Sequence, residues 1–144
     1  MPLSQELAHL RSFLDLQRLR LPEAEAATAI VLHVDGPVAP EAFPIAPLLL
    51  LPLPLVENAF KHGDLAARPG AIRIEIELPD AATLHVTVHN YVVTRDAALP
   101  AQPSGLGLHN LRRRLELIYP GRHALTVRIL PGEYAVTLEL GGVA

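Results

Sequence analysis

One short segment of the chain gathers side chains that could bind phosphate and a metal ion. The sequence LVENAFKHGD, residues 55–64, contains Glu57, Asn58, Lys61 and His62, and Lys61 is the only lysine of the chain. A carboxamide oxygen is a ligand that Mg²⁺ accepts beside phosphate and water. An ammonium group supplies a point charge to phosphate. Taken singly, these residues also fit a helix cap, a solvated side chain or a helix stop.

A second polar segment, SGLGLHNLRRRL at residues 104–115, places Gly105 and Gly107 at the start of a predicted helix. The N-terminus of a helix offers unpaired N–H groups and a positive dipole, which favour an anion. Glycine also lets the backbone approach a phosphate closely. No GK[ST] sequence follows, so this is not a P-loop, and such glycines alone also fit an ordinary turn.

Apolar periodicity predicts the elements that must position these two segments. A helix is expected over residues 3–21, with Ser4 as its N-cap and a stripe formed by Leu3, Leu7, Leu10, Leu14 and Leu21. That stripe fits packing on its own domain or a contact between two copies equally well. Two further helices are expected, at about 54–62 and over 108–118, where Pro120-Gly121 ends the second.

The remaining segments alternate with the period of strands. Residues 28–34, 72–78, 84–90, 125–129 and 134–140 alternate mostly apolar with polar side chains, with Thr28 and Asn90 as the polar exceptions on the apolar side, and Pro79-Asp80 and Pro131-Gly132 predict turns. Five strands that are apolar on one side need a covering layer. The expected fold class is therefore α+β, a two-layer sandwich with helices on the sheet.

Composition limits the classes of function. The chain has 144 residues, is 50% hydrophobic and carries a net charge of −3, as expected for one globular domain. This charge argues against nucleic acid as the main partner, and the absence of cysteine fits the cytoplasm. The apolar run from residue 45 to 56 contains three prolines and is shorter than the roughly 20 residues of a membrane-spanning helix. No signal peptide is recognised.

Together, PLVENAFKHG and SGLGLHNLRRRLELIYPG resemble the N-box and G2-box of the GHKL ATPases. More narrowly, the chain resembles the ATP-binding domain of LytS/AlgZ-type sensor histidine kinases. The resemblance implies a Bergerat fold, a mixed sheet with helices on one face and ATP between them. It divides the chain into residues 1–22, a helix from the end of the dimerisation and phosphoacceptor region, and residues 23–144, the catalytic domain.

The resemblance also implies roles for single residues. Asn58 corresponds to the Mg²⁺ ligand, Lys61 to a phosphate contact and His62 to a side chain beside adenine, and Glu57 is the candidate catalytic residue. The other implied nucleotide-binding residues form one segment: Gly105, Leu106, Gly107 and Leu108. The expected cofactors are ATP and Mg²⁺.

The family reads adenine with Asp-x-Gly at the end of a strand, and this chain departs from that motif. In LHVTVHNYVV the strand alternation places Asn90 on the buried face, at the position of the aspartate, and Val92 at the position of the glycine. An asparagine oxygen can still accept from the adenine amino group. The neutral Asn90 and the bulky Val92 leave open a pseudokinase-like interaction module with weak or no nucleotide binding.

The leading hypothesis is the catalytic domain of a two-component histidine protein kinase. Its expected partners are nucleotide, the dimerisation and phosphoacceptor helices of the parent kinase, and indirectly a response regulator. The phosphoacceptor is expected outside this chain, because nothing around His9 matches the acceptor motif. The domain is expected to be cytoplasmic, reaching a membrane only through upstream segments, with a possible homodimer through residues 3–21. Another GHKL ATPase, such as an anti-sigma kinase, fits the helix at 3–21 and the LRRRLELIYPG segment less well.

Overall fold

The computed structural model describes residues 2–19, 29–43, 71–91 and 105–141. Within these ranges lie two α-helices, one short 3-10 helix and five strands. In chain order they are α1 (Leu3–Arg18), β1 (Ile30–Asp35), η1 (Pro40–Ala42), β2 (Ile72–Asp80), β3 (Thr83–Tyr91), α4 (Gly105–Ile118), β4 (His123–Leu130) and β5 (Glu133–Leu140). The helix predicted at about 54–62 falls outside the described residues.

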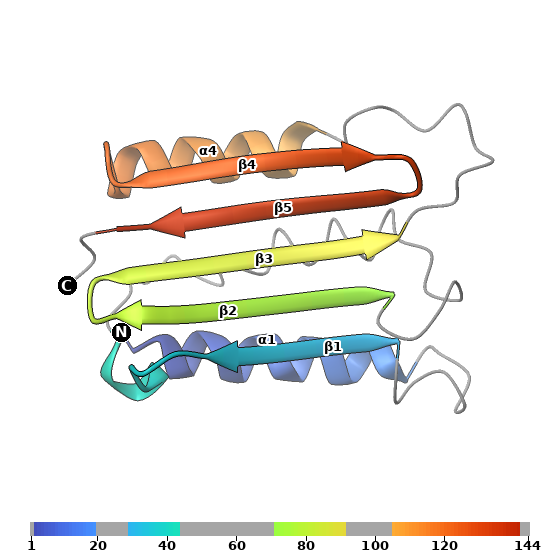
Figure 1. The fold of residues 1–144 in the computed structure, drawn as a ribbon, viewed down its shortest axis with the longest axis horizontal. Coiled ribbons are helices and arrows are strands. Elements are labelled where there is room, and N and C mark those ends of the chain that lie inside the picture. Colours follow the sequence, from blue (N-terminus) through green and yellow to red (C-terminus); the bar gives the residue numbers. More distant parts are fainter. Residues whose placement is uncertain (1, 20–28, 44–70, 92–104, 142–144) are drawn as a thin grey trace.

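The five strands form one mixed sheet in the order β1-β2-β3-β5-β4. Strand β1 runs parallel to β2, and the other neighbouring pairs are antiparallel. Helices α1 and α4 lie on the same side of the sheet, α1 near β1 and α4 near β4 (Figure 1). The predicted α+β architecture, with a mixed sheet of about five strands and helices on one face, is confirmed.

Strand alternation decides which side chains reach the core beneath the helices. On β2 the even-numbered residues Ile72, Ile74, Ile76 and Leu78 are fully buried, whereas Arg73 and Glu77 are exposed. Strand β3 continues this pattern with Leu84, Val86 and Val88, and β5 with Val136, Leu138 and Leu140. These residues form one continuous core with the apolar stripes of the helices.

Helix α1 packs on the sheet of its own domain. The stripe residues Leu3, Leu7, Leu10 and Leu14 are at most 1% exposed and belong to the same core cluster as the strands. Leu16 and Leu19 lie off that stripe and are 62% and 82% exposed. Of the two alternatives for this stripe, the structure therefore shows packing within the domain. The division at residue 22 and a homodimer through this helix stay predictions.

The ends of α1 differ from the prediction. The helix ends at Arg18 rather than at residue 21, and its N-cap is Pro2 rather than Ser4. The backbone N–H of Leu3 donates to the carbonyl oxygen of Phe43 at 2.8 Å, so a distant segment satisfies a donor that a capping side chain otherwise serves. This tertiary hydrogen bond was not visible in the local sequence.

The two hairpin turns and the end of α4 lie at or next to the turn residues that the sequence predicted. Gly132, between β4 and β5, has φ 76°, and Gly121, after α4, has φ 70°, both in the left-handed region that favours glycine. In the turn between β2 and β3, Asp80 accepts hydrogen bonds from the Ala82 N–H and the Thr83 hydroxyl. These bonds, the one from Ala82 first, lower the pKa of the Asp80 carboxyl.

Candidate functional site

Asn90 lies where β3 ends, on the face of the sheet that the helices cover. Its side chain is fully buried, as the strand alternation predicted. Its amide nitrogen Nδ2 donates to the carbonyl oxygen of Tyr91 at 3.3 Å. Its oxygen Oδ1 is buried and has no hydrogen-bond partner among the described residues. A buried acceptor without a donor is unfavourable for folding, and a ligand's N–H group that reached this oxygen would satisfy it.

Helix α4 begins at the same end of the sheet. Its first residue is Gly105, and Gly107 falls within its first turn, so both glycines belong to the helix rather than to a preceding loop. The helix ends near His123, which pairs with Leu140, and Leu140 in turn faces Leu84 at the start of β3. The N-terminus of α4 therefore points toward the end of the sheet that holds Asn90 (Figure 1). Its free N–H groups and dipole favour an anion there.

A tyrosine that the sequence analysis did not assign to the site lies beside Asn90. Tyr134 is the cross-strand partner of Asn90 and is 8% exposed. Its hydroxyl is also buried without a hydrogen-bond partner in the described part of the chain. Burial raises the pKa of this phenol to about 12, although the charge of Arg112 acts in the opposite direction. The alternation Tyr134-Val136-Leu138-Leu140 was the available signal, because it placed this hydroxyl inward.

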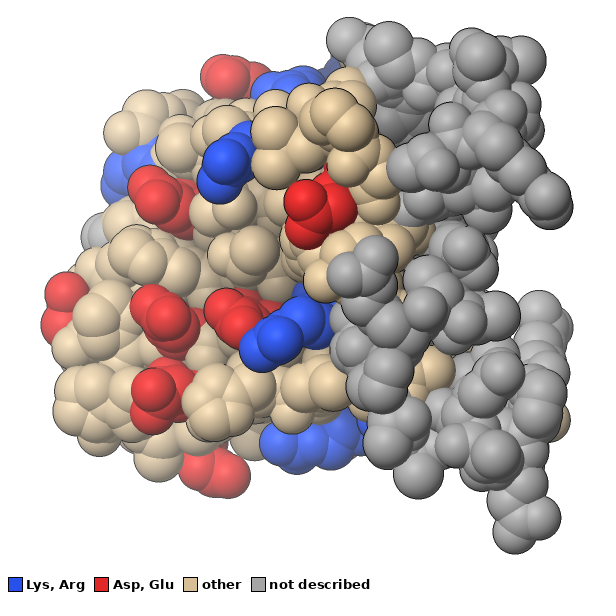
Figure 2. All heavy atoms as spheres, turned by 45° about the vertical axis from the view of Figure 1, so that its right-hand side comes forward, with Lys and Arg blue, Asp and Glu red and all other residues tan. Residues whose placement is uncertain are grey.

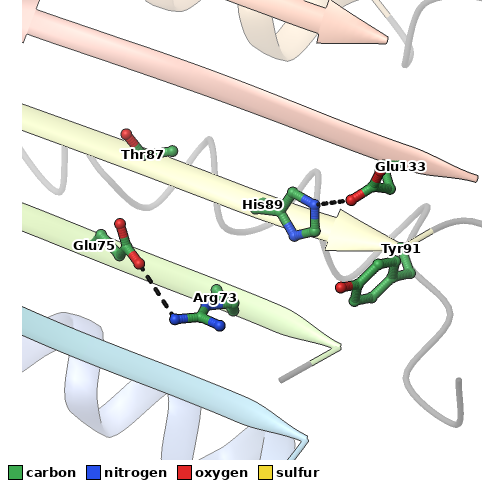
Figure 3. A pocket seen from close by; sticks show the side chains of 6 residues that line it. All are labelled: Arg73, Glu75, Thr87, His89, Tyr91 and Glu133. Carbon is green, nitrogen blue, oxygen red and sulfur yellow. Dashed lines mark hydrogen bonds and ion pairs between the residues drawn. The ribbon is translucent and has the colours of Figure 1, made fainter. Parts of the chain in front are cut away.

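A separate polar hollow of about 290 Å³ lies on the other face of the sheet, lined by Arg73, Glu75, Thr87, His89, Tyr91 and Glu133. Figure 3 shows His89 turned toward Glu133 and Arg73 turned toward Glu75. The His89 Nε2 to Glu133 Oε1 distance is 2.9 Å, and the Arg73 to Glu75 distance is 3.4 Å. Arg73 and the Nε2 atom of His89 therefore each have an acidic partner on this face. Since His89 and Asn90 are successive strand residues, the hollow opens away from Asn90.

The outer face carries charges of both signs. Figure 2 shows acidic side chains spread across it, with basic side chains between them. Asp35, Glu77 and Glu139 on this face are exposed. Within the described residues, no group of three or more histidine or acidic side chains could hold a metal ion. No helix in those ranges is long and apolar enough to cross a membrane.

Solved histidine kinases share this fold. The catalytic domain of the histidine kinase ThkA, in a nucleotide-free form, matches 99% of this chain and 94% of its own length, with 13% identity and a TM-score of 0.57. Full-length ShkA, solved in complex with AMPPNP, matches 100% of this chain and 31% of its own length, with 18% identity and a TM-score of 0.56. At such identities the likeness shows the fold, which is that of a histidine kinase catalytic domain.

A curated relative adds a likeness in sequence. The sensor protein LytS of Oceanobacillus iheyensis is 30% identical over 126 residues, which cover 79% of this chain. The chain is related to the LytS-type sensor histidine kinases. It spans 20% of the length of that curated relative. No family model matches the chain.

The described residues include two of the segments to which the LytS-type resemblance assigns nucleotide contacts. The fold brings Asn90 and the backbone of α4 from Gly105 onward to one end of the sheet. The residues Glu57, Asn58, Lys61 and His62 lie outside the described residues, as do the side chains of Leu106 and Leu108. The proposed roles of these residues therefore stay predictions.

Proposed function

We propose that this chain is the ATP-binding catalytic domain of a sensor histidine kinase, which holds Mg-ATP for phosphoryl transfer to a histidine outside the chain. One observation carries the proposal: the buried Asn90 Oδ1 has no partner in the described structure, at the strand end where the family reads adenine. The complex of ShkA with AMPPNP supports it, because that kinase shares the fold and binds an ATP analogue.

The donor and acceptor chemistry at this end of the sheet fits ATP. Asn90 Oδ1 accepts from the exocyclic amino group of adenine, and the first turn of α4 receives phosphate at its free N–H groups. From the resemblance, Asn58 holds Mg²⁺, Lys61 contacts phosphate and His62 flanks the base. Glu57 polarises a proton close to the transferred group. Bound Mg-ATP supplies the phosphoryl group, and the chain's own residues bind, orient and shield it.

The parent protein supplies the rest of the reaction. Because the chain spans 20% of its LytS relative, the phosphoacceptor histidine, the dimerisation helices and the sensor region are proposed to lie in other parts of that parent. A response regulator then receives the phosphoryl group, so this chain meets it only indirectly. The parent is proposed to be membrane-bound, with this domain on the cytoplasmic side.

An interaction module of the same fold, with weak or no nucleotide binding, is the second candidate function. Asn90 favours it, because a neutral amide replaces the family's aspartate and forms a weaker hydrogen bond than an ionised acceptor. Val92, where the family has glycine, adds bulk in the same motif. The affinity for ATP separates the two functions.

Substitution of Asn58 and Asn90 tests the proposal by calorimetric titration with ATP and Mg²⁺. Asn58→Ala is expected to abolish the Mg²⁺-dependent part of binding while the unfolding transition stays unchanged, because it removes an oxygen ligand of the metal. Asn90→Ala is expected to weaken ATP binding by about 1–3 kcal/mol, since the ligand's amino group loses its buried acceptor. Asn90→Asp is expected to match or exceed the parent, because it restores an ionised acceptor. Equal affinity of the parent and both alanine variants would remove these residues from the site.

A further inference from the structure

The inner face of the β3–β5 pair changes from apolar to polar at its last step. The cross-strand pairs along this face are Leu84 with Leu140, Val86 with Leu138, Val88 with Val136, and Asn90 with Tyr134. All of these side chains are buried. The first three pairs contribute only hydrocarbon to the core. The fourth pair contributes an amide and a phenol, at the end of the sheet toward which α4 presents its N-terminus.

The two polar groups of this last pair have complementary capacities. Asn90 Nδ2 is engaged with the Tyr91 carbonyl oxygen at 3.3 Å, which leaves Oδ1 as an acceptor without a partner. The Tyr134 hydroxyl also lacks a partner among the described residues, and it can donate its proton. With a pKa of about 12, the phenol stays protonated at physiological pH. The pair therefore presents one acceptor beside one donor.

A packing role alone does not account for the hydroxyl of Tyr134. Phenylalanine would fill the same inward position on β5 with the same ring and without a buried polar atom. Tyr119 is also buried, but it lies at the opposite end of the sheet. There its backbone carbonyl oxygen accepts from the Arg122 N–H and contacts the His123 ring. Two unpaired polar atoms on one cross-strand pair indicate a ligand that satisfies both of them.

We propose that Tyr134 is an adenine-binding residue of the nucleotide site, donating to N1 of adenine while Asn90 accepts from the adjacent amino group. The inference rests on the proposed function and adds a residue to that site. Adenine presents a donor next to an acceptor along this edge. Guanine presents a carbonyl oxygen where adenine has the amino group, which places an acceptor against Asn90 Oδ1, whereas the Tyr134 hydroxyl can accept from guanine N1–H as well as donate to adenine N1.

The test measures ATP and GTP affinity by calorimetry at saturating Mg²⁺ for the parent, Tyr134→Phe and Tyr119→Phe. Loss of one neutral hydrogen bond is expected to weaken ATP binding about 3- to 10-fold in Tyr134→Phe. GTP affinity is expected to be lower than ATP affinity in all three proteins, because the carbonyl oxygen of guanine would face the acceptor Asn90 Oδ1. Tyr119→Phe, the matched control, is expected to keep both affinities.

Unfolding of the nucleotide-free proteins separates a binding role from a structural one. Tyr134→Phe is expected to be as stable as the parent or more stable, since it removes a buried hydroxyl without a partner. An unchanged ATP affinity would contradict the assignment and leave Tyr134 as a packing residue. If the parent itself binds neither nucleotide, the proposed function fails and the assignment fails with it.

Discussion

Buried polar atoms without partners are unfavourable for folding, and the described structure places two of them on one cross-strand pair of its inner face. Asn90 Oδ1 and the Tyr134 hydroxyl share one end of the inner sheet face. A site that satisfies such atoms with a ligand gains selectivity, because a ligand that lacks the matching group leaves them unpaired. At the residue scale, these two unpaired atoms lower the stability of the nucleotide-free domain. A bound base that pairs with them is expected to restore it.

The pH dependence of unfolding reports on Tyr134 directly. Burial raises the pKa of this phenol to about 12, whereas an unfolded tyrosine has a pKa of about 10. The folded state thus holds the proton more tightly, so this contribution to stability is complete below about pH 10 and is lost as pH rises toward 12. By pH 11, one unit below the raised pKa, the expected loss is on the order of 1 kcal/mol. Urea unfolding of the parent and Tyr134→Phe between pH 8 and 11 measures it.

The comparison with Tyr134→Phe decides whether this residue is responsible. The free energy of unfolding of the phenylalanine variant is expected to fall less steeply above pH 10 than that of the parent. Parallel curves for the two proteins would show that another group titrates.

At the scale of elements, Gly36 directly follows β1 and lies against the backbone of β2. Its φ is 121°, and a Cβ added there would lie 2.7 Å from the carbonyl carbon of Leu78. Gly121, after α4, has φ 70° and nothing within 4 Å of such a Cβ. Gly121→Ala is therefore expected to cost about 1–2 kcal/mol from backbone strain alone. Gly36→Ala is expected to cost more, because strain and the clash with backbone add.

Thermal or urea unfolding of these two alanine variants provides the measurement. Equal destabilisation by both substitutions would mean that the backbone around Leu78 shifts easily and that β1 is loosely held.

Helix α1 provides the second element-scale prediction. Leu10 is 1% exposed within the core cluster, whereas Leu16 on the same helix is 62% exposed. Leu10→Ala is expected to destabilise the domain by about 2–5 kcal/mol, because it leaves a cavity between helix and sheet. Leu16→Ala is expected to change stability by less than about 0.5 kcal/mol. A concentration-dependent loss of stability in Leu16→Ala would instead indicate that α1 joins two copies.

The sequence predicted the elements that local patterns determine, but not the features that depend on contacts between distant segments. Period-two alternation placed β2, β3 and β5 correctly, including the inward side chain of Asn90, because burial on one face dictates that pattern. The predicted start of α1 at residue 3 is confirmed, but its predicted N-cap Ser4 was wrong, since the Leu3 N–H pairs with the distant Phe43 carbonyl. Strand order, and with it the pairing of Asn90 and Tyr134, depends on contacts between segments far apart in the chain.

Two arginine side chains form hydrogen bonds to edge strands that local sequence patterns do not predict. Arg18 from α1 donates to the Ile30 carbonyl oxygen on edge strand β1, and Arg112 from α4 donates to the Leu125 carbonyl oxygen on edge strand β4. An unpaired edge of a sheet invites pairing with another chain, and a charged side chain on an edge carbonyl opposes it. Neither contact is indicated by the residues next to these arginines in the sequence.

At the scale of the whole molecule, the two faces of the sheet are suited to different roles. The inner face holds the core and the candidate nucleotide site, whereas the outer face is polar, with its His89–Glu133 and Arg73–Glu75 pairs already formed. The fold is that of a histidine kinase catalytic domain, and the sequence relative is a sensor protein five times the length of the matched part. The central claim is that this domain holds Mg-ATP at the end of the sheet that contains Asn90.

Amide NMR during a titration with ATP and Mg²⁺ tests that claim most directly. The account predicts saturable shifts for the amides of Asn90, Tyr91 and the first turn of α4, and these shifts should weaken when Mg²⁺ is omitted. The amides of Ala82 and Arg122, at the opposite end of the sheet, should stay in place. Absence of saturable shifts at millimolar ATP, or shifts confined to the outer face around His89 and Glu133, would contradict the account.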